Sequence, residues 1–307
     1  MMSRDSKLKI AIIAGTALLG GFIALVMGIR LPVSELTGPI AVVGFLGPCA
    51  AFYHKRQTAQ FVSCLMAVMQ VLVFTACFTL LMYSVATFSM PFVDGPIAEC
   101  DRLLNVHVPD IVLWANNHSI ISNVLLITYH TMLPQTLILV IALGFIGDQK
   151  QLESFVLRFM TALLITVSIF AIAPAKGPFA HYGMKNSPSQ ERYLEHLTTL
   201  RNGDRTEIVL SETEGLVTFP SFHTAWAILL MMAVWHRKRV FVPVCILNLA
   251  VIAGTLTTGW HYFTDVLGGV VIAFAVMAIT RKLEPWLAAR SPEKCVLAEE
   301  VPPITHS

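Results

Sequence analysis

Charged residues are scarce in this sequence. Only 13% of the 307 residues are Asp, Glu, Lys or Arg, about half of the roughly 25% found in soluble domains. The apolar share is 55% and the mean hydropathy is +0.69. So little charge does not suffice to cover a soluble globule of this length, and the composition also excludes disordered, coiled-coil and collagen-like chains. The sequence therefore indicates an integral membrane protein.

Two further absences narrow the function. No Cys-x-x-Cys pair is present, and most of the cysteines lie inside apolar runs, where free Cys behaves as a small hydrophobe; we therefore expect neither a disulfide nor a zinc site. No basic run resembles a nucleic-acid-binding patch, and the net charge is only +2, so we expect no nucleic-acid partner. The six cysteines are Cys49, Cys64, Cys77, Cys100, Cys245 and Cys295.

The sequence contains many long runs without charged residues. A hydrocarbon core of about 30 Å needs about 20 residues in helical conformation. By this measure we predict an all-α polytopic membrane protein with about eight spans. The first run follows Arg4, Lys7 and Lys9, but its length favours a span over a cleaved signal peptide. The expected spans are 10–29, 38–53, 61–87, 122–147, 159–173, 219–235, 240–258 and 262–280.

The distribution of Lys and Arg predicts the orientation. With the N-terminus in the cytoplasm, the inside segments hold fourteen of these residues and the outside segments hold seven. This asymmetry follows the positive-inside rule. The outside segments are then 30–37, 89–121 and 174–217, and the last two are long enough to suggest a functional role.

Three polar motifs fall at the outer ends of the spans. They are Pro-Ala-Lys-Gly-Pro at 174–178, Thr-Phe-Pro-Ser-Phe-His at 218–223 and His-Tyr-Phe-Thr-Asp at 261–265. His261 and Asp265 are four residues apart, so on a helix they share a face, and the carboxylate can accept the Nδ1 proton of the imidazole. Together with His223 they form a predicted catalytic arrangement. The alternative is a structural His-Asp pair beside a packed histidine.

The same face offers groups suited to an anion. Thr218 is expected to cap a helix N-terminus, whose free N–H groups and dipole attract phosphate. Ser221 adds a hydroxyl and Lys176 a nearby cation. The alternatives are a simple helix cap and a lysine that extends to the membrane interface.

These motifs resemble a known family. Pro-Ser-Phe-His at 220–223, His-Tyr-x-x-Asp at 261–265 and the following Leu-Gly-Gly are similar to the second and third signatures of the type 2 phosphatidic acid phosphatase superfamily. Within it the chain looks most like the branch related to inositol phosphorylceramide synthases, in its bacterial members. Tyr129 with Pro134-Gln135, the 174–178 segment and Leu-Arg-Asn-Gly at 200–203 add to this resemblance, which runs from 94 to 280.

The sequence departs from the superfamily at two signatures. The first signature, Lys-x6-Arg-Pro, is not met, because Gly183 and Met184 stand where Arg and Pro are usual. The third usually places Ser-Arg seven and six residues before the histidine, and here those positions are Gly254 and Thr255. The synthase-like branch also lacks that arginine. The missing charge is then expected from Lys176 or from Arg201, unless Arg201 is an ordinary loop cation.

The resemblance implies a mechanism and a domain plan. His261 would form a phosphohistidine, Asp265 would orient it and His223 would serve as acid and base, while Ser221, Lys176 and Arg201 bind phosphate. No metal and no cofactor are expected. Residues 1–60 would be two helices outside the family, 61–283 a membrane domain with a six-helix core, and 284–307 a cytoplasmic tail.

The expected substrate is a lipid phosphate or phosphodiester that enters from the outer leaflet of the membrane, which is a bacterial inner membrane by the resemblance. The acceptor is water, giving a phosphatase, or the hydroxyl of a lipid or polyol, giving a headgroup transferase; the residues do not decide between them. Two readings from other classes stay open: a transporter without enzymatic activity, and a metal hydrolase in which two His and one Asp hold zinc.

Overall fold

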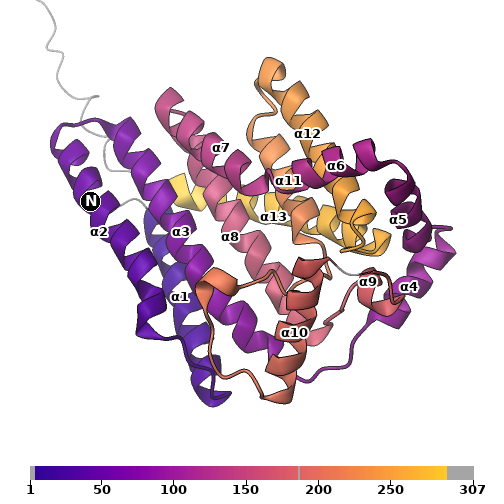
Figure 1. The fold of residues 1–307 in the computed structure, drawn as a ribbon. Helices are drawn as coiled ribbons and strands as arrows, with labels where there is room; N and C mark the ends of the chain where they lie inside the picture. The colour runs from indigo at the N-terminus through magenta and orange to yellow at the C-terminus, as the bar shows by residue number, and fades with distance from the viewer. Residues whose placement is uncertain (1–3, 186, 289–307) are drawn as a thin grey trace, which may run out of the picture.

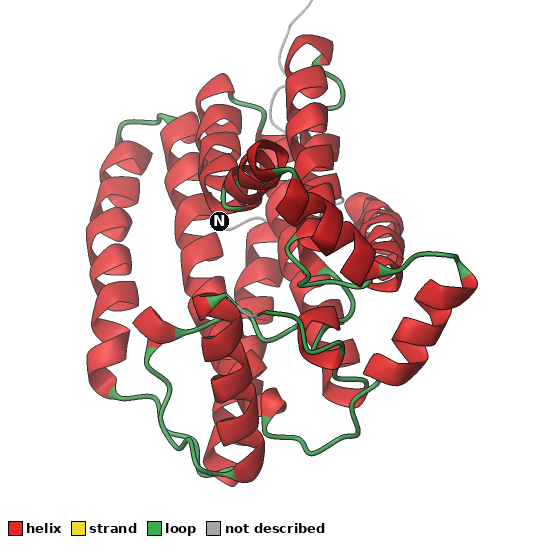
Figure 2. Ribbon diagram, turned by 45° about the vertical axis from the view of Figure 1, so that its right-hand side comes forward, coloured by secondary structure: helices red, strands yellow, loops and turns green. Residues whose placement is uncertain are grey.

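The computed structural model describes residues 4–185 and 187–288, and within this part the chain is helical and contains no strand (Figure 2). An isolated bridge between Arg30 and Glu207 is its nearest approach to a sheet. The predicted all-α fold class is confirmed. In a bilayer this is expected, because a helix satisfies its own backbone hydrogen bonds.

Six helices in the described part are long and apolar enough to cross a membrane. They agree with six of the expected spans, including the run 38–53, where Pro48 is accommodated inside the helix. These helices are α1 (Arg4–Val26), α2 (Thr37–Lys55), α3 (Ala59–Ala86), α8 (Gln149–Ile172), α12 (Lys238–Thr257) and α13 (Phe263–Ala288). Several helices of this kind fit an integral membrane protein.

The two other expected spans are shorter than a bilayer requires, so the count of eight is not reached. The run 122–147 is divided between α6 (Ser119–Tyr129) and α7 (Met132–Ile146), and the run 219–235 contains only α11 (Phe222–Ala233). Pro134 fits the first break: it has no N–H to donate to the carbonyl of His130 and its ring crowds that carbonyl, which favours a kink or a break at this point. The helix α5 (Val108–Asn117) precedes α6 at a bend of 113°, and that pair would make a seventh span if counted as one.

The helices pack around α3, α8, α11 and α13, which contribute most of the hydrophobic core. The helices α1 and α2 both pack on α3, and Figure 1 shows them together at one side of the molecule. The short helices α4 (Asp94–Leu103) and α9 (Pro178–His181) lie at the opposite side. The N-terminal pair is therefore remote from the ends of α11 and α13 that carry the polar motifs.

The segment 174–217, expected as a long loop, contains the helix α10 (Pro188–Asn202) and the short 3-10 helix η2 (Leu210–Glu212). Ser187 and Gln190 form a capping box at the start of α10, and Gly203 ends it with a φ of 79°. Tyr193 is fully buried, and its hydroxyl donates to the carbonyl of Ala175 at 3.1 Å. The helix thus supports the 174–178 motif.

The last helix is longer than the expected span 262–280. The helix α13 continues to Ala288, so the first residues of the expected tail 284–307 belong to it. The remainder of that tail, 289–307, lies outside the described residues.

Candidate active site

The structure brings the two histidines and the aspartate together. His223 lies in the first turn of α11, His261 in the turn between α12 and α13, and Asp265 in the first turn of α13. The ring centroids of His223 and His261 are 5.8 Å apart. His261 and Asp265 are buried, with 2% and 0% exposure, and His223 is half-buried. Their catalytic roles stay predictions, but the spatial grouping needed for them is present.

The imidazole of His261 is oriented chiefly by a backbone carbonyl. Its Nδ1 lies 2.7 Å from the carbonyl oxygen of Thr218 and 3.4 Å from Oδ2 of Asp265. Because a carbonyl only accepts, Nδ1 carries the proton and Nε2 is left with its lone pair. Thr218 thus provides the shorter of the two contacts to Nδ1, and Oδ2 of Asp265 also accepts from the amide of Tyr262 at 2.8 Å; the orienting role of Asp265 stays a prediction.

Burial keeps His261 neutral. Removal from water disfavours the charged imidazolium and lowers the pKa of His261 to about 4, although the hydrogen bond to Thr218 acts in the opposite direction. At neutral pH the ring is therefore uncharged. An uncharged ring with Nδ1–H bonded to a carbonyl presents Nε2 as a nucleophile.

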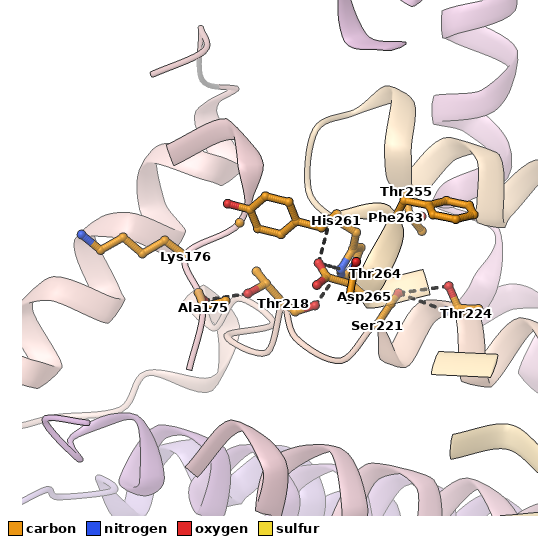
Figure 3. Close-up of polar contacts among 12 residues, drawn as sticks. Ala175, Lys176, Thr218, Ser221, Thr224, Thr255, His261, Phe263, Thr264 and Asp265 are labelled. Atoms are coloured by element: carbon orange, nitrogen blue, oxygen red, sulfur yellow. Dashed lines mark hydrogen bonds and ion pairs between the residues drawn. The ribbon is translucent and has the colours of Figure 1, made fainter. Parts of the chain in front are cut away.

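The helix cap at α11 is Ser221, and the expectation of Thr218 was wrong. The Ser221 hydroxyl accepts from the amide of Thr224 at 3.3 Å and from its hydroxyl at 3.2 Å. Thr218 instead donates its hydroxyl to the carbonyl of Ala175 at 2.7 Å, as Figure 3 shows. Thr218 thus links the 174–178 motif to His261, while phosphate binding by Ser221 stays a prediction.

The two glycines of the Leu-Gly-Gly motif lie where a side chain would clash with the start of α11. A Cβ on Gly269 would lie 2.4 Å from the carbonyl oxygen of Ser221 and 2.7 Å from Cβ of Thr224, and a Cβ on Gly268 would lie 2.9 Å from Cβ of Pro220. Glycine therefore allows α13 to approach the start of α11. This close approach brings Asp265 to the end of α11 that carries His223.

The two expected cations meet at one aromatic ring. Nζ of Lys176 lies 4.6 Å and Cζ of Arg201 lies 4.1 Å from the ring centroid of Phe92, and Arg201 also donates to the carbonyl of Met90. In Figure 3 the Lys176 side chain extends away from His261. The cations thus form a cluster outside the histidine pair, and phosphate binding by either stays a prediction.

Sequence reasoning gave no role to three residues that contact the site. Tyr129 stacks on His223, with ring centroids 4.6 Å apart, and the buried carboxylates of Asp94 and Asp101 bond the segments beside His261. The spacing of the two aspartates was an available signal. Residues seven apart lie on one face of a helix, and two carboxylates on one face are unusual in a chain so poor in charge.

A cleft of about 600 Å³ opens beside these segments, a volume in the range of small-molecule sites. It is bounded in part by His181 and Tyr182, whose rings lie 6.3 and 6.4 Å from that of Tyr262. A space of small-molecule size therefore adjoins the segment that carries His261. Among the described residues, no group of three or more His, Cys, Asp or Glu side chains is placed to hold a metal ion.

No curated protein and no solved structure matches the chain. The model of the PAP2 superfamily matches residues 95–279, which is more than half of the chain. The match includes His223, His261 and Asp265 and leaves out α1, α2 and α3. It supports a phosphatase or phosphotransferase type of function. Because the match covers more than half of the chain, the chain belongs to the PAP2 superfamily.

Proposed function

We propose that this protein is a membrane-embedded enzyme that transfers the phosphoryl group of a lipid phosphate or phosphodiester through a phosphohistidine on His261. The observation that carries the proposal is the pairing of a neutral His261, held through Nδ1 by Thr218, with His223 at 5.8 Å between ring centroids. Two imidazoles at this separation are close enough for one bound phosphoryl group to contact both.

The first half-reaction forms the intermediate. His223 takes up a proton when the phosphate anion binds beside it, because the negative charge favours the imidazolium. The lone pair on Nε2 of His261 then attacks phosphorus, the bond to the leaving oxygen breaks, and His223 donates its proton to that oxygen. Asp265, whose Oδ2 lies 3.4 Å from Nδ1, stabilises the positive charge that develops on the ring. No metal or cofactor takes part in these steps as proposed.

The second half-reaction releases the product. His223, now neutral, takes the proton of the acceptor hydroxyl, the acceptor oxygen attacks phosphorus, and the N–P bond returns its electron pair to His261. With water as acceptor the enzyme is a lipid phosphatase; with the hydroxyl of a lipid or polyol it is a headgroup transferase related to inositol phosphorylceramide synthases. The chemistry at the two histidines is the same in both.

The residues at the missing signature positions, Gly254 and Thr255, carry no positive charge. The usual arginine position holds Thr255, which is fully buried and whose carbonyl accepts from the amide of His261 at 3.3 Å. At the preceding position, a Cβ on Gly254 would lie 2.9 Å from the carbonyl oxygen of Leu125. We therefore propose that Lys176 and Arg201, together with Ser221, neutralise the phosphoryl oxygens once the headgroup is bound.

We further propose that the site faces the extracytoplasmic side of a bacterial inner membrane. The support is the excess of Lys and Arg in the segments placed in the cytoplasm, and the position of the polar motifs at the other helix ends. The domain plan proposed is a pair of accessory helices at 1–60, a catalytic membrane domain at 61–283 and a cytoplasmic tail.

The full chain, purified into nanodiscs with mixed phospholipids, tests this function. Mass spectrometry of the products separates free phosphate, which indicates a phosphatase, from a new headgroup lipid, which indicates a transferase. His223→Ala and His261→Ala should each abolish turnover, whereas His54→Ala, at an exposed position in α2, should not. Full activity in both site variants would contradict the proposal. Substrate uptake into vesicles by the His261→Ala protein would favour a transporter, and loss of activity in a chelator would favour a metal hydrolase.

A further inference from the structure

The helix α4 carries two buried carboxylates that the reaction does not use. Asp94 is 5% exposed and Asp101 is 1% exposed. Burying a carboxylate costs free energy unless its oxygens are well bonded. Each of these two carboxylates accepts hydrogen bonds from three neutral donors, and every one of those donors lies in the 174–178 motif or in the residues that follow His261.

Asp94 bonds two segments at once. It accepts from the amides of Lys176 and Gly177, each at 2.9 Å, and from the hydroxyl of Tyr262 at 3.1 Å. Tyr262 follows His261 directly in the chain. Asp94 therefore ties the 174–178 motif to the turn that carries His261.

Asp101 caps α13 from a neighbouring helix. It accepts from the amide of Phe263 at 2.9 Å, and from the amide and hydroxyl of Thr264 at 2.7 and 2.6 Å. These are amides of the first turn of α13, which have no partner within their own helix. A carboxylate at this end also interacts favourably with the helix dipole.

Together the two carboxylates hold the whole tripeptide between His261 and Asp265. Tyr262 is bonded through its hydroxyl, Phe263 through its amide and Thr264 through both groups. Figure 1 shows α4 at the edge of the molecule beside α9, where it also contacts α13. The position of the His261 ring relative to Asp265 thus depends on a helix that contains neither residue.

The helix α4 is also linked, through the 174–178 motif, to Thr218, which accepts the hydrogen bond from His261. Ala175, next to Lys176, accepts from the hydroxyl of Thr218 at 2.7 Å, and the carbonyl of Thr218 accepts from Nδ1 of His261 at 2.7 Å. Asp94 therefore acts on both the chain segment that carries His261 and the segment that orients its ring.

We propose that Asp94 and Asp101 are positioning residues for His261, which hold its nucleophilic nitrogen in line with the phosphoryl group without touching the substrate. The proposal rests on the proposed function. Its consequence is specific: loss of either carboxylate slows phosphoryl transfer while substrate binding persists, because a displacement of about 1 Å at a nucleophile costs about 100-fold in rate.

Asp94→Asn and Asp101→Asn are the principal variants. Each keeps the shape of the side chain, but its NH₂ group faces a donor where a carboxylate oxygen accepted, so at least one hydrogen bond is lost. The matched control is Asp110→Asn, the same change in α5, where the side chain is 78% exposed. We expect kcat to fall about 10- to 100-fold in the two α4 variants, with KM within about threefold of the wild type, and neither constant to change in the control.

Two milder variants test the same positioning role if Asp94→Asn and Asp101→Asn do not fold. Tyr262→Phe removes the hydroxyl that donates to Asp94, and Thr264→Val removes the hydroxyl that donates to Asp101, while the backbone bonds remain. Each should lower kcat at least threefold at unchanged KM, measured on protein that elutes as one species. An unchanged kcat, or a rise in KM that accounts for the whole loss, would overturn the proposal.

The same assay separates this proposal from the proposed function. If the wild type and His261→Ala release phosphate equally, the proposed function fails. If the wild type is active, His261→Ala is inactive and the foldable variants among Asp94→Asn, Asp101→Asn, Tyr262→Phe and Thr264→Val keep the wild-type kcat, the positioning role alone fails.

Discussion

The imidazole of His261 and the main chain of Thr218 are joined by a hydrogen bond of 2.7 Å from Nδ1 to the carbonyl oxygen. This bond assigns the proton to Nδ1 and leaves Nε2 free. A main-chain acceptor persists when side chains are replaced, so the tautomer of His261 does not depend on Asp265. The carboxylate, at 3.4 Å, is left with an electrostatic role.

Asp265→Asn separates these two roles. Because Thr218 still orients the ring, we expect kcat to fall about 10- to 100-fold, less than in His261→Ala, with KM little changed. Steady-state kinetics on the purified variant measure this. A loss as complete as that of His261→Ala would mean that Asp265, and not Thr218, decides the tautomer.

The pH below which protonation of His261 slows the first half-reaction should lie well below the usual pKa of histidine. The unfolded-state pKa is about 6.5, and burial lowers the pKa of His261 to about 4. Between these values the folded protein keeps His261 neutral and active. Single-turnover formation of the phosphoenzyme should therefore not slow down between pH 7 and pH 5.5, because the same change also favours protonation of His223, the proposed acid of this step; a tenfold loss per pH unit below 6.5 would contradict this.

The lowered pKa of His261 should also make the stability of the folded protein depend on pH. As the pH falls from about 6.5 toward 4, the unfolded chain takes up a proton at His261 before the folded chain does. The free energy of unfolding should decrease across this window. The decrease should be smaller in His261→Ala, as seen by thermal denaturation in detergent at several pH values.

Gly269→Ala tests the close approach of α13 to α11. The added Cβ would meet the carbonyl oxygen of Ser221 at 2.4 Å, so the two helices must separate. We expect a loss of about 1–3 kcal/mol in stability together with loss of activity. Gly21→Ala in α1, where no atom lies within 4 Å of the added Cβ, is the control and should change neither property.

Lys176→Gln tests the predicted phosphate contact. If the cation at Phe92 turns toward the bound headgroup, kcat/KM for a lipid monophosphate should fall about tenfold, as for the loss of one charged hydrogen bond. Lys185→Gln, at an exposed position of the same segment, is the control. Equal kcat/KM in both variants would assign Lys176 to its contact with Phe92 alone.

Cys100 provides a test of orientation. It is free and exposed on α4, on the side proposed to face out of the cytoplasm. A membrane-impermeant maleimide added to intact spheroplasts should label the protein, and Cys100→Ser should remove that labelling. Labelling that requires permeabilised membranes would place the site on the cytoplasmic side.

Helix positions followed from the sequence where an apolar run was long and uninterrupted, as in α3, whereas α8 begins at Gln149, before the expected span 159–173. The run 122–147 shows where this reasoning fails. Hydropathy does not register that Pro134 removes one N–H donor and crowds the carbonyl of His130, so α6 and α7 were read as one span. The segment 174–217 was read as a loop although Ser187 and Gln190 form a capping box for α10.

The sequence by itself determined the membrane fold, the superfamily resemblance and the two histidines, because apolar runs and short motifs are local patterns. Only the tertiary structure decided which atoms meet. That Thr218 orients His261, and that Asp94 and Asp101 hold the residues after it, depends on contacts between segments from about 40 to more than 160 positions apart. Such contacts follow from how helices pack, and that packing is a property of the whole chain.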